Sequence, residues 1–334
     1  MHTELLEVSK LNIRYRTKNR TIHAVRNLSI SIRRGEVVGL VGESGCGKST
    51  FGMSLLRLLP KSTDISAEKM VFNAEDSSLG EGIEILKLSE KELRRLRWKH
   101  VSVVFQGSMN SLNPVARIGD QLADAMFWHG FNDETIENNI TSYLELVHLD
   151  DSIRKNYPHE LSGGMKQRVA IAMALVCGPE LVVADEPTTA LDVVVQRKIL
   201  KLLMDTKDKL NLSVIFITHD ISLLASIADR VAVMYAGSIV EIGDVKTLFR
   251  RPLHPYTRGL MSTIPRIDER QTELVEINGS PPDLSSDIGG CPFAPRCNIA
   301  TELCTRETPE LRALGDAHLV SCHNAEMSVN GKTG

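Results

Sequence analysis

A glycine-rich segment at residues 42–50 has the residue types and spacing of a phosphate-binding loop. Its letters, GESGCGKST, fit the pattern G-x4-G-K-S/T between the apolar run VVGLV and the helix-compatible FGMSLLRLL. Glycines let backbone N–H groups turn inward around phosphate oxygens, and the amino end of a helix adds positive potential. We expect a nucleoside triphosphate to bind through Gly42, Ser44, Gly45, Cys46, Gly47, Lys48, Ser49 and Thr50.

Three side chains of this segment have separate expected roles. Lys48 would reach the β and γ phosphates, and the Ser49 hydroxyl would ligate Mg²⁺. Cys46 occupies an x position of the pattern and is interpreted as a filler. A reactive thiol is the alternative, because helix amino ends lower thiol pKa values.

A pair of carboxylates follows another apolar run, in the sequence LVVADEP. In phosphoryl transfer, a strand-end aspartate supports the Mg²⁺ shell and a second carboxylate can polarise the attacking water. We therefore assign Asp185 to the metal and Glu186 to the general base. An ordinary acidic strand exit would look similar in isolation, but the phosphate-binding pattern favours the catalytic interpretation.

Four of the six cysteines crowd into the C-terminal segment. Cys291 and Cys297 enclose five residues, Cys297 and Cys304 six, and Cys304 and Cys322 seventeen. We expect an intracellular chain, in which disulfides do not persist, so four thiols suggest one metal site. The spacing lacks the short C-x2-C pairs of structural zinc sites, which leaves both an iron–sulfur cluster and Zn²⁺ held by four thiolates open.

Composition limits the possible classes of protein. The chain has 334 residues, a net charge of -3 and 42% hydrophobic residues. Its length favours a large domain plus an appendage, and its charge gives no basic field for a nucleic-acid binder. We find no run of roughly 18 apolar residues and no secretory leader in the start MHTELLEVSK.

Hydrophobic patterning indicates an α/β chain. LLEVSKLNIRY and IHAVRNLSISI alternate like antiparallel strands, whereas the apolar runs at 101–105, 181–184 and 214–218 alternate with helical stretches, as in a doubly wound sheet. Between about 107 and 177 helical patterning dominates. After Asp244 the chain is rich in Pro, Gly, Ser and Cys, which predicts loop held by something other than a core.

The segment LSGGMKQR, shortly before LVVADEP, makes the chain resemble ATP-binding cassette (ABC) transporter ATPases over about residues 5–250. A serine N-cap and two glycines opening a helix also form an anion nest. The resemblance implies a P-loop NTPase core with an antiparallel β subdomain and an inserted helical subdomain at about 107–177. By the same resemblance, Ser162, Gly163 and Gly164 contact the γ-phosphate of ATP on a partner cassette.

The resemblance implies further roles at single positions. Gln106 would sense Mg²⁺ and water and couple to the membrane subunit, and His219 would contact the γ-phosphate. The loop 189–192, ending in Asp192, would cross the dimer interface. Tyr15 would stack on adenine; Arg14, Arg16 or a merely packed tyrosine are the alternatives.

The C-terminal part, residues 251–334, resembles the tail of oligopeptide and dipeptide permease ATPases through RRPLHPYTRGLMSTIP, GCPFAPRC and SCH. The resemblance implies a 4Fe–4S cluster on Cys291, Cys297, Cys304 and Cys322, with a structural role. QGSMNSLNP departs from the family's more usual QDPMTSLNP, which leaves the contact to the membrane subunit open. AEKMVFN and VMYAGSIVEIGD resemble the first of the two ATPase types, which favours a non-identical partner cassette.

The resemblance therefore implies an ATP-hydrolysing subunit at the cytoplasmic face of the membrane. Its partners would be a second homologous ATPase, two transmembrane permease subunits and, indirectly, an extracytoplasmic solute-binding protein; no nucleic acid is expected. The nearest alternative is the ATPase of an oligosaccharide importer. A soluble cassette of DNA repair or translation would carry two cassettes or long coiled coils, and a non-hydrolysing binder would not need Glu186 and His219.

Overall fold

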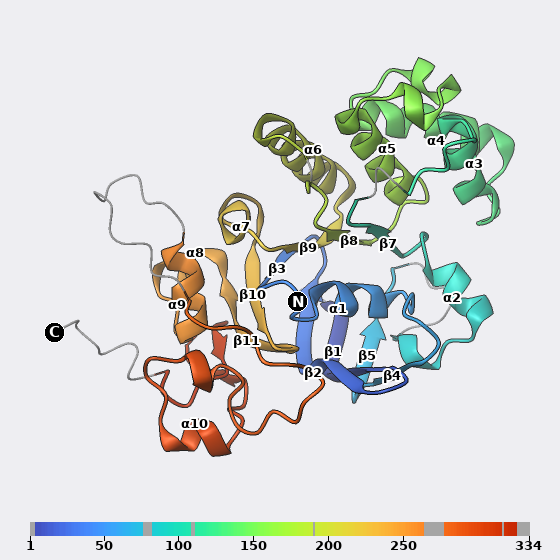
Figure 1. Ribbon diagram of the computed structural model, residues 1–334. Helices are drawn as coiled ribbons and strands as arrows, with labels where there is room; N and C mark the ends of the chain where they lie inside the picture. The colour runs from blue at the N-terminus through green and yellow to red at the C-terminus, as the bar shows by residue number, and fades with distance from the viewer. Residues whose placement is uncertain are drawn as a thin grey trace.

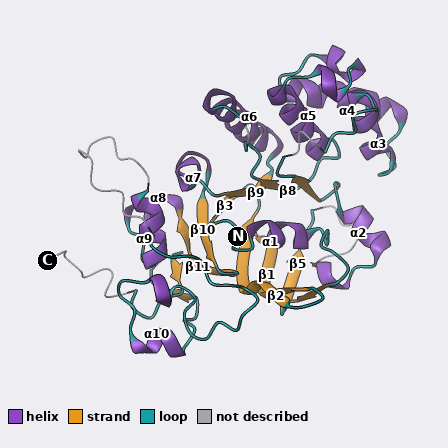
Figure 2. Ribbon diagram, in the orientation of Figure 1, coloured by secondary structure: helices purple, strands orange, loops and turns teal. Residues whose placement is uncertain are grey.

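Short apolar runs form the parallel centre of an eight-stranded sheet in the computed structural model, which describes residues 4–75, 82–107, 111–189, 191–263, 277–315 and 317–325 (Figures 1 and 2). The parallel centre has five strands. Four of them are buried along their whole length, which explains why their sequences are near-continuous apolar runs. In spatial order the strands are β10 (Arg230–Tyr235), β3 (Val37–Val41), β9 (Ser213–Thr218), β8 (Leu181–Asp185) and β7 (Val101–Val104).

Three antiparallel strands extend this sheet beyond β10. β11 (Ser238–Asp244) pairs with β10, β13 (Leu319–Val320) with β11, and β12 (Arg312–Ala313) with β13. The last two strands come from the cysteine-containing part of the chain. That part therefore continues the central sheet at its edge.

A second sheet is antiparallel throughout. β1 pairs with β2, β4 and β5, and β5 with β6, which confirms the antiparallel strands expected from the alternating N-terminal sequence. The strands are β1 (Glu4–Arg16), β2 (Thr21–Arg33), β4 (Thr63–Ser66), β5 (Lys69–Phe72) and β6 (Ile83–Glu84).

Helix α1 (Lys48–Leu55) lies between the two sheets, because its Phe51 and Leu55 share one buried cluster with strand residues of both. The helix ends earlier than the apolar pattern up to Leu59 predicts. Its C-cap is Leu56, and Arg57 has a φ of 50°, in the left-handed region that ends a helix.

Between β7 and β8 the chain forms α3 (Ile118–Phe127), α4 (Asp133–Leu146) and α5 (Gly163–Leu175), which confirms the helical patterning there. Figure 1 shows these three helices grouped beyond the β7–β8 edge of the sheet. Residues 108–110 of QGSMNSLNP and Ala190 of the loop 189–192 lie outside the described residues.

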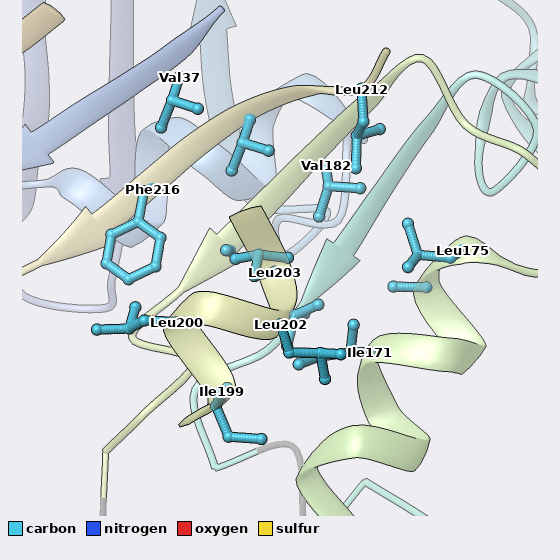
Figure 3. Packing of buried hydrophobic residues seen from close by; sticks show 14 of the residues in the cluster. Val37, Ile171, Leu175, Val182, Ile199, Leu200, Leu202, Leu203, Leu212 and Phe216 are labelled. Atoms are coloured by element: carbon cyan, nitrogen blue, oxygen red, sulfur yellow. The ribbon is translucent and has the colours of Figure 1, made fainter. Parts of the chain in front are cut away.

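Helix α6 (Val193–Leu210) joins this helical group to the sheet. Figure 3 shows Leu200 and Leu203 of α6 near Phe216 and Val182 of the strands, with Ile171 of α5 on the other side. These side chains belong to one buried cluster. The remaining helices are α2 (Glu90–Leu96), α7 (Ile221–Ile227), α8 (Val245–Arg250), α9 (Pro255–Ser262) and α10 (Glu302–Arg306).

Among the described residues, no helix has both the length and the apolar character needed to cross a membrane.

The segment after residue 251, called the extension below, differs from the expected loop without a core. Tyr256 of α9 and Phe293 are buried in the main hydrophobic cluster. Glu241 of β11, which is 0% exposed, accepts hydrogen bonds from the backbone N–H groups of Leu253 (2.7 Å) and His254 (2.8 Å). Its carboxylate also bonds His318 Nε2 at 2.7 Å, so one buried carboxylate ties both ends of the extension to the sheet. Residues 264–276 and 326–334 lie outside the described part.

Candidate functional site

The segment 42–50 forms a tight loop between β3 and α1. A Cβ atom on Gly42 would lie 2.1 Å from the Met234 carbonyl oxygen, so only glycine fits there. Gly45 and Gly47 have φ values of 79° and 102°, a region that side chains disfavour. The glycine spacing found in the sequence is therefore a requirement of the loop's backbone.

Lys48 lies inside this loop. Its side chain is buried, and Nζ donates to the carbonyl oxygens of Gly42 at 2.7 Å and Glu43 at 2.9 Å. These bonds place the ammonium at the centre of the loop, where the oxygens of a bound phosphate would meet it.

Cys46 is enclosed beside Lys48, and its side chain is buried. Burial raises the pKa of the thiol, and the neighbouring Lys48 ammonium offsets only part of that rise. Such a thiol stays protonated, which favours the filler interpretation over the reactive one.

Ser49 and Asp185 meet across the gap between α1 and β8. The Ser49 hydroxyl donates to Asp185 Oδ1 at 3.0 Å. Burial raises the pKa of Asp185, and the hydrogen bond from Ser49 opposes that rise. A hydroxyl and a carboxylate at this distance are the hard oxygen donors that Mg²⁺ prefers.

Glu186 is held by side chains from three neighbouring strand ends. Gln106 Nε2 donates to Oε2 at 3.0 Å, His219 Nδ1 donates to Oε1 at 3.0 Å, and Thr189 Oγ1 donates to Oε2 at 3.0 Å. Because β7, β8 and β9 are parallel, their carboxyl ends meet at one edge of the sheet. This edge carries Gln106, Glu186 and His219, and the phosphate loop leaves β3 beside it.

The backbone and charge of Glu186 are both unusual. Its φ is 45°, a left-handed conformation that side chains rarely adopt, and its N–H donates to Ile217 O at 3.0 Å. Burial alone would raise its pKa, but the hydrogen bonds from His219 and Thr189 outweigh burial, and the pKa lies below the ordinary value. Glu186 is therefore an ionised carboxylate at neutral pH.

Tyr15 of β1 lies beside the start of α1. Its hydroxyl donates to Thr50 Oγ1 at 3.1 Å, which places the ring beside the phosphate loop. Arg16, one alternative for stacking on a base, is paired with Asp64 at 2.5 Å. Ser44 and Gly45 are exposed at the tip of the loop.

The residues expected to face a partner cassette lie at two helix starts. Ser162 caps α5 by accepting from the Met165 N–H at 3.4 Å, and Gly163 and Gly164 open that helix. Asp192 caps α6 by accepting from the N–H groups of Val194 and Val195. Within the described ranges, no hydrogen bond joins these residues to the phosphate loop of the same chain, so a single chain does not bring the two sets together.

The four C-terminal cysteines line one pocket. Cys291, Cys297, Cys304 and Cys322 line it together with residues that include His254 and Phe293. All four cysteines are free thiols. In the part of the chain that the structure describes, no group of three or more His, Cys, Asp or Glu side chains is arranged so that it could hold a metal ion.

Burial disfavours the thiolate form of three cysteines of this pocket. Burial raises the pKa of Cys291 to about 11 and also raises the pKa of Cys297 and Cys322. Backbone hydrogen bonds act in the opposite direction: from Phe293 and Ala294 to Cys291, from Ile299 to Cys297, and from Asn324 to Cys322. Backbone donors of this kind stabilise thiolates.

Comparison with known proteins decides the family. The ABC transporter family matches residues 25–189, and the family described as the oligopeptide/dipeptide transporter C-terminal region matches residues 240–304. The dipeptide transport ATP-binding protein DppD of Bacillus subtilis is 43% identical over 96% of this chain and 94% of its own length. The oligopeptide transport ATP-binding protein OppD of Salmonella typhimurium is 43% identical over 95% and 93%. This chain belongs to the family of ATP-binding subunits of peptide ABC transporters.

A solved structure agrees with this assignment. The ATP-binding cassette MJ0796, in a dimeric post-hydrolysis state with ADP and Pi, has a TM-score of 0.61 and 26% identity, covering 72% of this chain and 98% of that one. The expected ABC ATPase fold is therefore confirmed. ATP-binding subunits of this family act with permease components of the same transporter.

The two family matches divide the site residues of this ABC transporter ATPase. The first contains the phosphate loop, Gln106, Ser162 and the Asp185–Glu186 pair, but ends before Asp192 and His219. The second contains Cys291, Cys297 and Cys304 and ends before Cys322. The structure places both residues with their sites: His219, at the end of β9, bonds Glu186, and Cys322 lines the pocket with the other three cysteines.

Sequence reasoning missed two residues that contact the phosphate loop. Arg296 and Tyr256 of the extension both bond to Glu43, the second residue of the loop. Glu43 occupies an x position of the loop pattern, and Arg296 lies 253 positions away along the chain. No local spacing could have linked them.

Proposed function

We propose that this chain hydrolyses ATP in sites shared with a second cassette and thereby powers the import of oligopeptides or dipeptides through a membrane permease. The observation that carries the proposal is the position of Glu186. It is an ionised carboxylate held by Gln106, His219 and Thr189 at the sheet edge where the phosphate loop begins. The relatives named as dipeptide and oligopeptide transport ATP-binding proteins support the peptide substrate.

In the proposed site, the backbone N–H groups of the loop 42–50 and the amino end of α1 cradle the phosphates. Lys48 moves its hydrogen bonds from the Gly42 and Glu43 carbonyls to phosphate oxygens. Tyr15 contacts Thr50, the last residue of the loop, and would stack on adenine there. The loop therefore binds the triphosphate and Tyr15 orients the base.

The chain also offers ligands for Mg²⁺. Ser49 and Asp185 supply oxygen donors 3.0 Å apart, and Gln106 adds an amide oxygen from the next strand. When bound, Mg²⁺ neutralises charge on the phosphate oxygens.

Hydrolysis then depends on one proton transfer. Glu186 accepts a proton from the attacking water, since its pKa lies below the ordinary value and the carboxylate is available at neutral pH. Its bonds to Gln106 and His219 hold the carboxylate at the sheet edge, and His219, which is largely exposed there, can turn toward the γ-phosphate. The base is thus positioned before nucleotide binds.

A second cassette completes the site. Ser162, Gly163 and Gly164 open α5 with backbone N–H groups that suit an anion, but they lack a nucleotide partner within their own chain. Two chains facing each other would place this helix start over the partner's loop, with Asp192 at the boundary. The dimeric state of the MJ0796 cassette supports this arrangement.

For the cysteine pocket we propose a 4Fe–4S cluster. Four thiols that line one pocket are the donor set that such a cluster uses. Cys291, Cys297, Cys304 and Cys322 would be the ligands, and a bound cluster would cross-link the extension. Zn²⁺ on the same four thiolates is the alternative.

Membership of the family supports a proposal for the assembly. We place the chain at the cytoplasmic face of the membrane with a non-identical second ATPase and two permease subunits, supplied by an extracytoplasmic solute-binding protein. Import of oligosaccharides by the same architecture is the second candidate. Transport assays with labelled dipeptides and labelled oligosaccharides in vesicles containing the whole transporter separate the two.

The function is tested by replacing the proposed base. Glu186→Gln keeps the size of the side chain but removes the proton acceptor, so ATP hydrolysis by the assembled transporter should fall about 10²–10⁴-fold while ATP still binds. Glu68→Gln, an exposed glutamate of the antiparallel sheet region, is the matched control and should leave turnover unchanged. Unchanged turnover in Glu186→Gln would remove Glu186 as the base.

A further inference from the structure

An arginine of the extension forms an ion pair with the phosphate loop. Arg296 Nη1 donates to Glu43 Oε2 at 2.9 Å, and Nη2 donates to Oε1 at 3.0 Å, which makes the ion pair bidentate. The Arg296 side chain is 6% exposed and that of Glu43 is 25% exposed. Bidentate pairs add geometric specificity as well as energy, so this contact fixes direction as well as distance.

The Arg296 guanidinium is fully engaged. Besides the two bonds to Glu43, Nε donates to Asn278 O at 2.9 Å, Nη2 to Ile277 O at 3.1 Å, and Nη1 to the Tyr235 hydroxyl at 3.2 Å. A guanidinium has five N–H donors, and these bonds account for all of them. The side chain therefore has one position, set by the extension and by β10.

A second contact from the extension reaches the same residue of the loop. The Glu43 backbone N–H donates to the Tyr256 hydroxyl at 2.9 Å. Tyr256 is fully buried, and its ring lies 4.7 Å from that of Tyr235 and 5.5 Å from that of Phe293. The extension thus holds both the backbone and the side chain of Glu43.

Glu43 in turn contacts Lys48, since the Glu43 carbonyl oxygen accepts one of the Lys48 Nζ hydrogen bonds. The other end of the contact lies at the cysteine pocket. Phe293 lines that pocket, and Arg296 immediately precedes Cys297. The side chain that holds the loop and a thiol of the pocket therefore belong to adjacent residues.

We propose that Arg296 is a positioning residue for the phosphate loop, through which the extension keeps the loop in the shape that binds ATP. Arg296 acts through Glu43 and touches no reacting atom. The inference rests on the proposed ATP site. If loss of Arg296 leaves the loop in its binding shape for a tenth of the time, the apparent Kd for ATP rises about tenfold.

The test is equilibrium binding of ATP to the purified full-length chain. Arg296→Ala should weaken ATP binding about tenfold and raise KM in the assembled transporter, with kcat at saturating ATP little changed. Arg306→Ala is the matched control. Arg306 pairs with Glu302, and both side chains are exposed, so this variant should bind ATP with wild-type affinity.

A double variant separates positioning from simple charge neutralisation. If Arg296 only cancels the charge of Glu43 near the phosphates, Arg296→Ala combined with Glu43→Gln should restore wild-type affinity. If Arg296 positions the loop, the double variant should bind ATP as weakly as Arg296→Ala alone. Restored affinity would overturn the proposal.

Thermal unfolding of each variant checks that it is folded at the assay temperature. Should Arg296→Ala unfold below the assay temperature, Arg296→Lys carries the test, because lysine keeps the charge but lacks the two-pronged geometry and should still weaken ATP binding. Wild-type affinity in a folded Arg296 variant contradicts the inference alone. Failure of the wild-type chain to bind ATP contradicts the proposed function itself.

Discussion

The edge of the central sheet and the extension position their residues in different ways. At the sheet edge, Gln106, Glu186 and His219 follow directly from the ends of neighbouring parallel strands, and the phosphate loop follows β3. The extension is fixed by single buried side chains, Glu241 and Arg296, that reach far along the chain. At the sheet edge, backbone geometry positions the residues, so substitutions at the surface should leave them in place. In the extension, the positions depend on individual side-chain contacts.

The largest effect is expected where the extension depends on its cysteines. Cys304→Ser removes one of the four thiolates that we propose as ligands of a 4Fe–4S cluster, so the purified chain should lose most of its iron and its absorbance at about 400 nm. The segment 277–325 should then be cut faster by protease, since a structural metal contributes folding energy directly.

Cys177→Ser, a change at a buried free thiol of the helical part, is the matched control and should keep its iron. Full iron content in Cys304→Ser would contradict the proposed ligand set. A wild-type chain containing zinc and no iron would replace the cluster with the zinc alternative.

The next effect concerns the buried carboxylate that ties the extension to the sheet. Glu241→Gln replaces one of the two acceptor oxygens with an NH₂ donor. At least one of the three donors, the N–H groups of Leu253 and His254 and the His318 ring, then loses its acceptor, so the free energy of unfolding should fall by about 3 kcal/mol. Chemical denaturation measures the loss. Glu302→Gln, at an exposed site of the extension, should change it by less than about 0.5 kcal/mol. Equal stability of the two variants would show that the anchor is dispensable.

The smallest expected effect lies at the opposite end of the strand that carries Asp185. Glu180, before β8, accepts from Arg34 at 2.6 Å and pairs with His100 at 3.0 Å. Burial opposes its ionisation, but these hydrogen bonds outweigh burial and hold its pKa below the ordinary value. Glu180→Gln should therefore cost about 2 kcal/mol of unfolding free energy at pH 7.

The pH dependence gives this prediction its sign. A carboxylate whose folded pKa is depressed stabilises the fold above its unfolded pKa, about 4.3, and loses that contribution as pH falls through the folded pKa. The stability difference between wild type and Glu180→Gln should therefore shrink below about pH 4. A difference that stays constant or grows toward acid pH would contradict the assignment.

The same contrast explains what the sequence could predict. The loop at 42–50, the strand runs and the acidic pair are local patterns, and parallel strands bring their ends together without further information. The bond between Arg296 and Glu43 and the three donors on Glu241 join distant residues through side-chain geometry, which no spacing encodes. The end of α1 at Leu55 could not be predicted either. The apolar pattern continues past Arg57, although the backbone of Arg57 is left-handed and the helix has already ended.

The most direct test of the account is a structure of the complete transporter with ATP and the Glu186→Gln substitution, which should trap the nucleotide before hydrolysis. The account predicts that the triphosphate lies between the loop 42–50 of this chain and the start of the signature helix of the second ATPase. It also predicts that Ser162 of this chain faces the γ-phosphate of the nucleotide bound to that partner. A structure in which ATP contacts only its own chain would contradict the account.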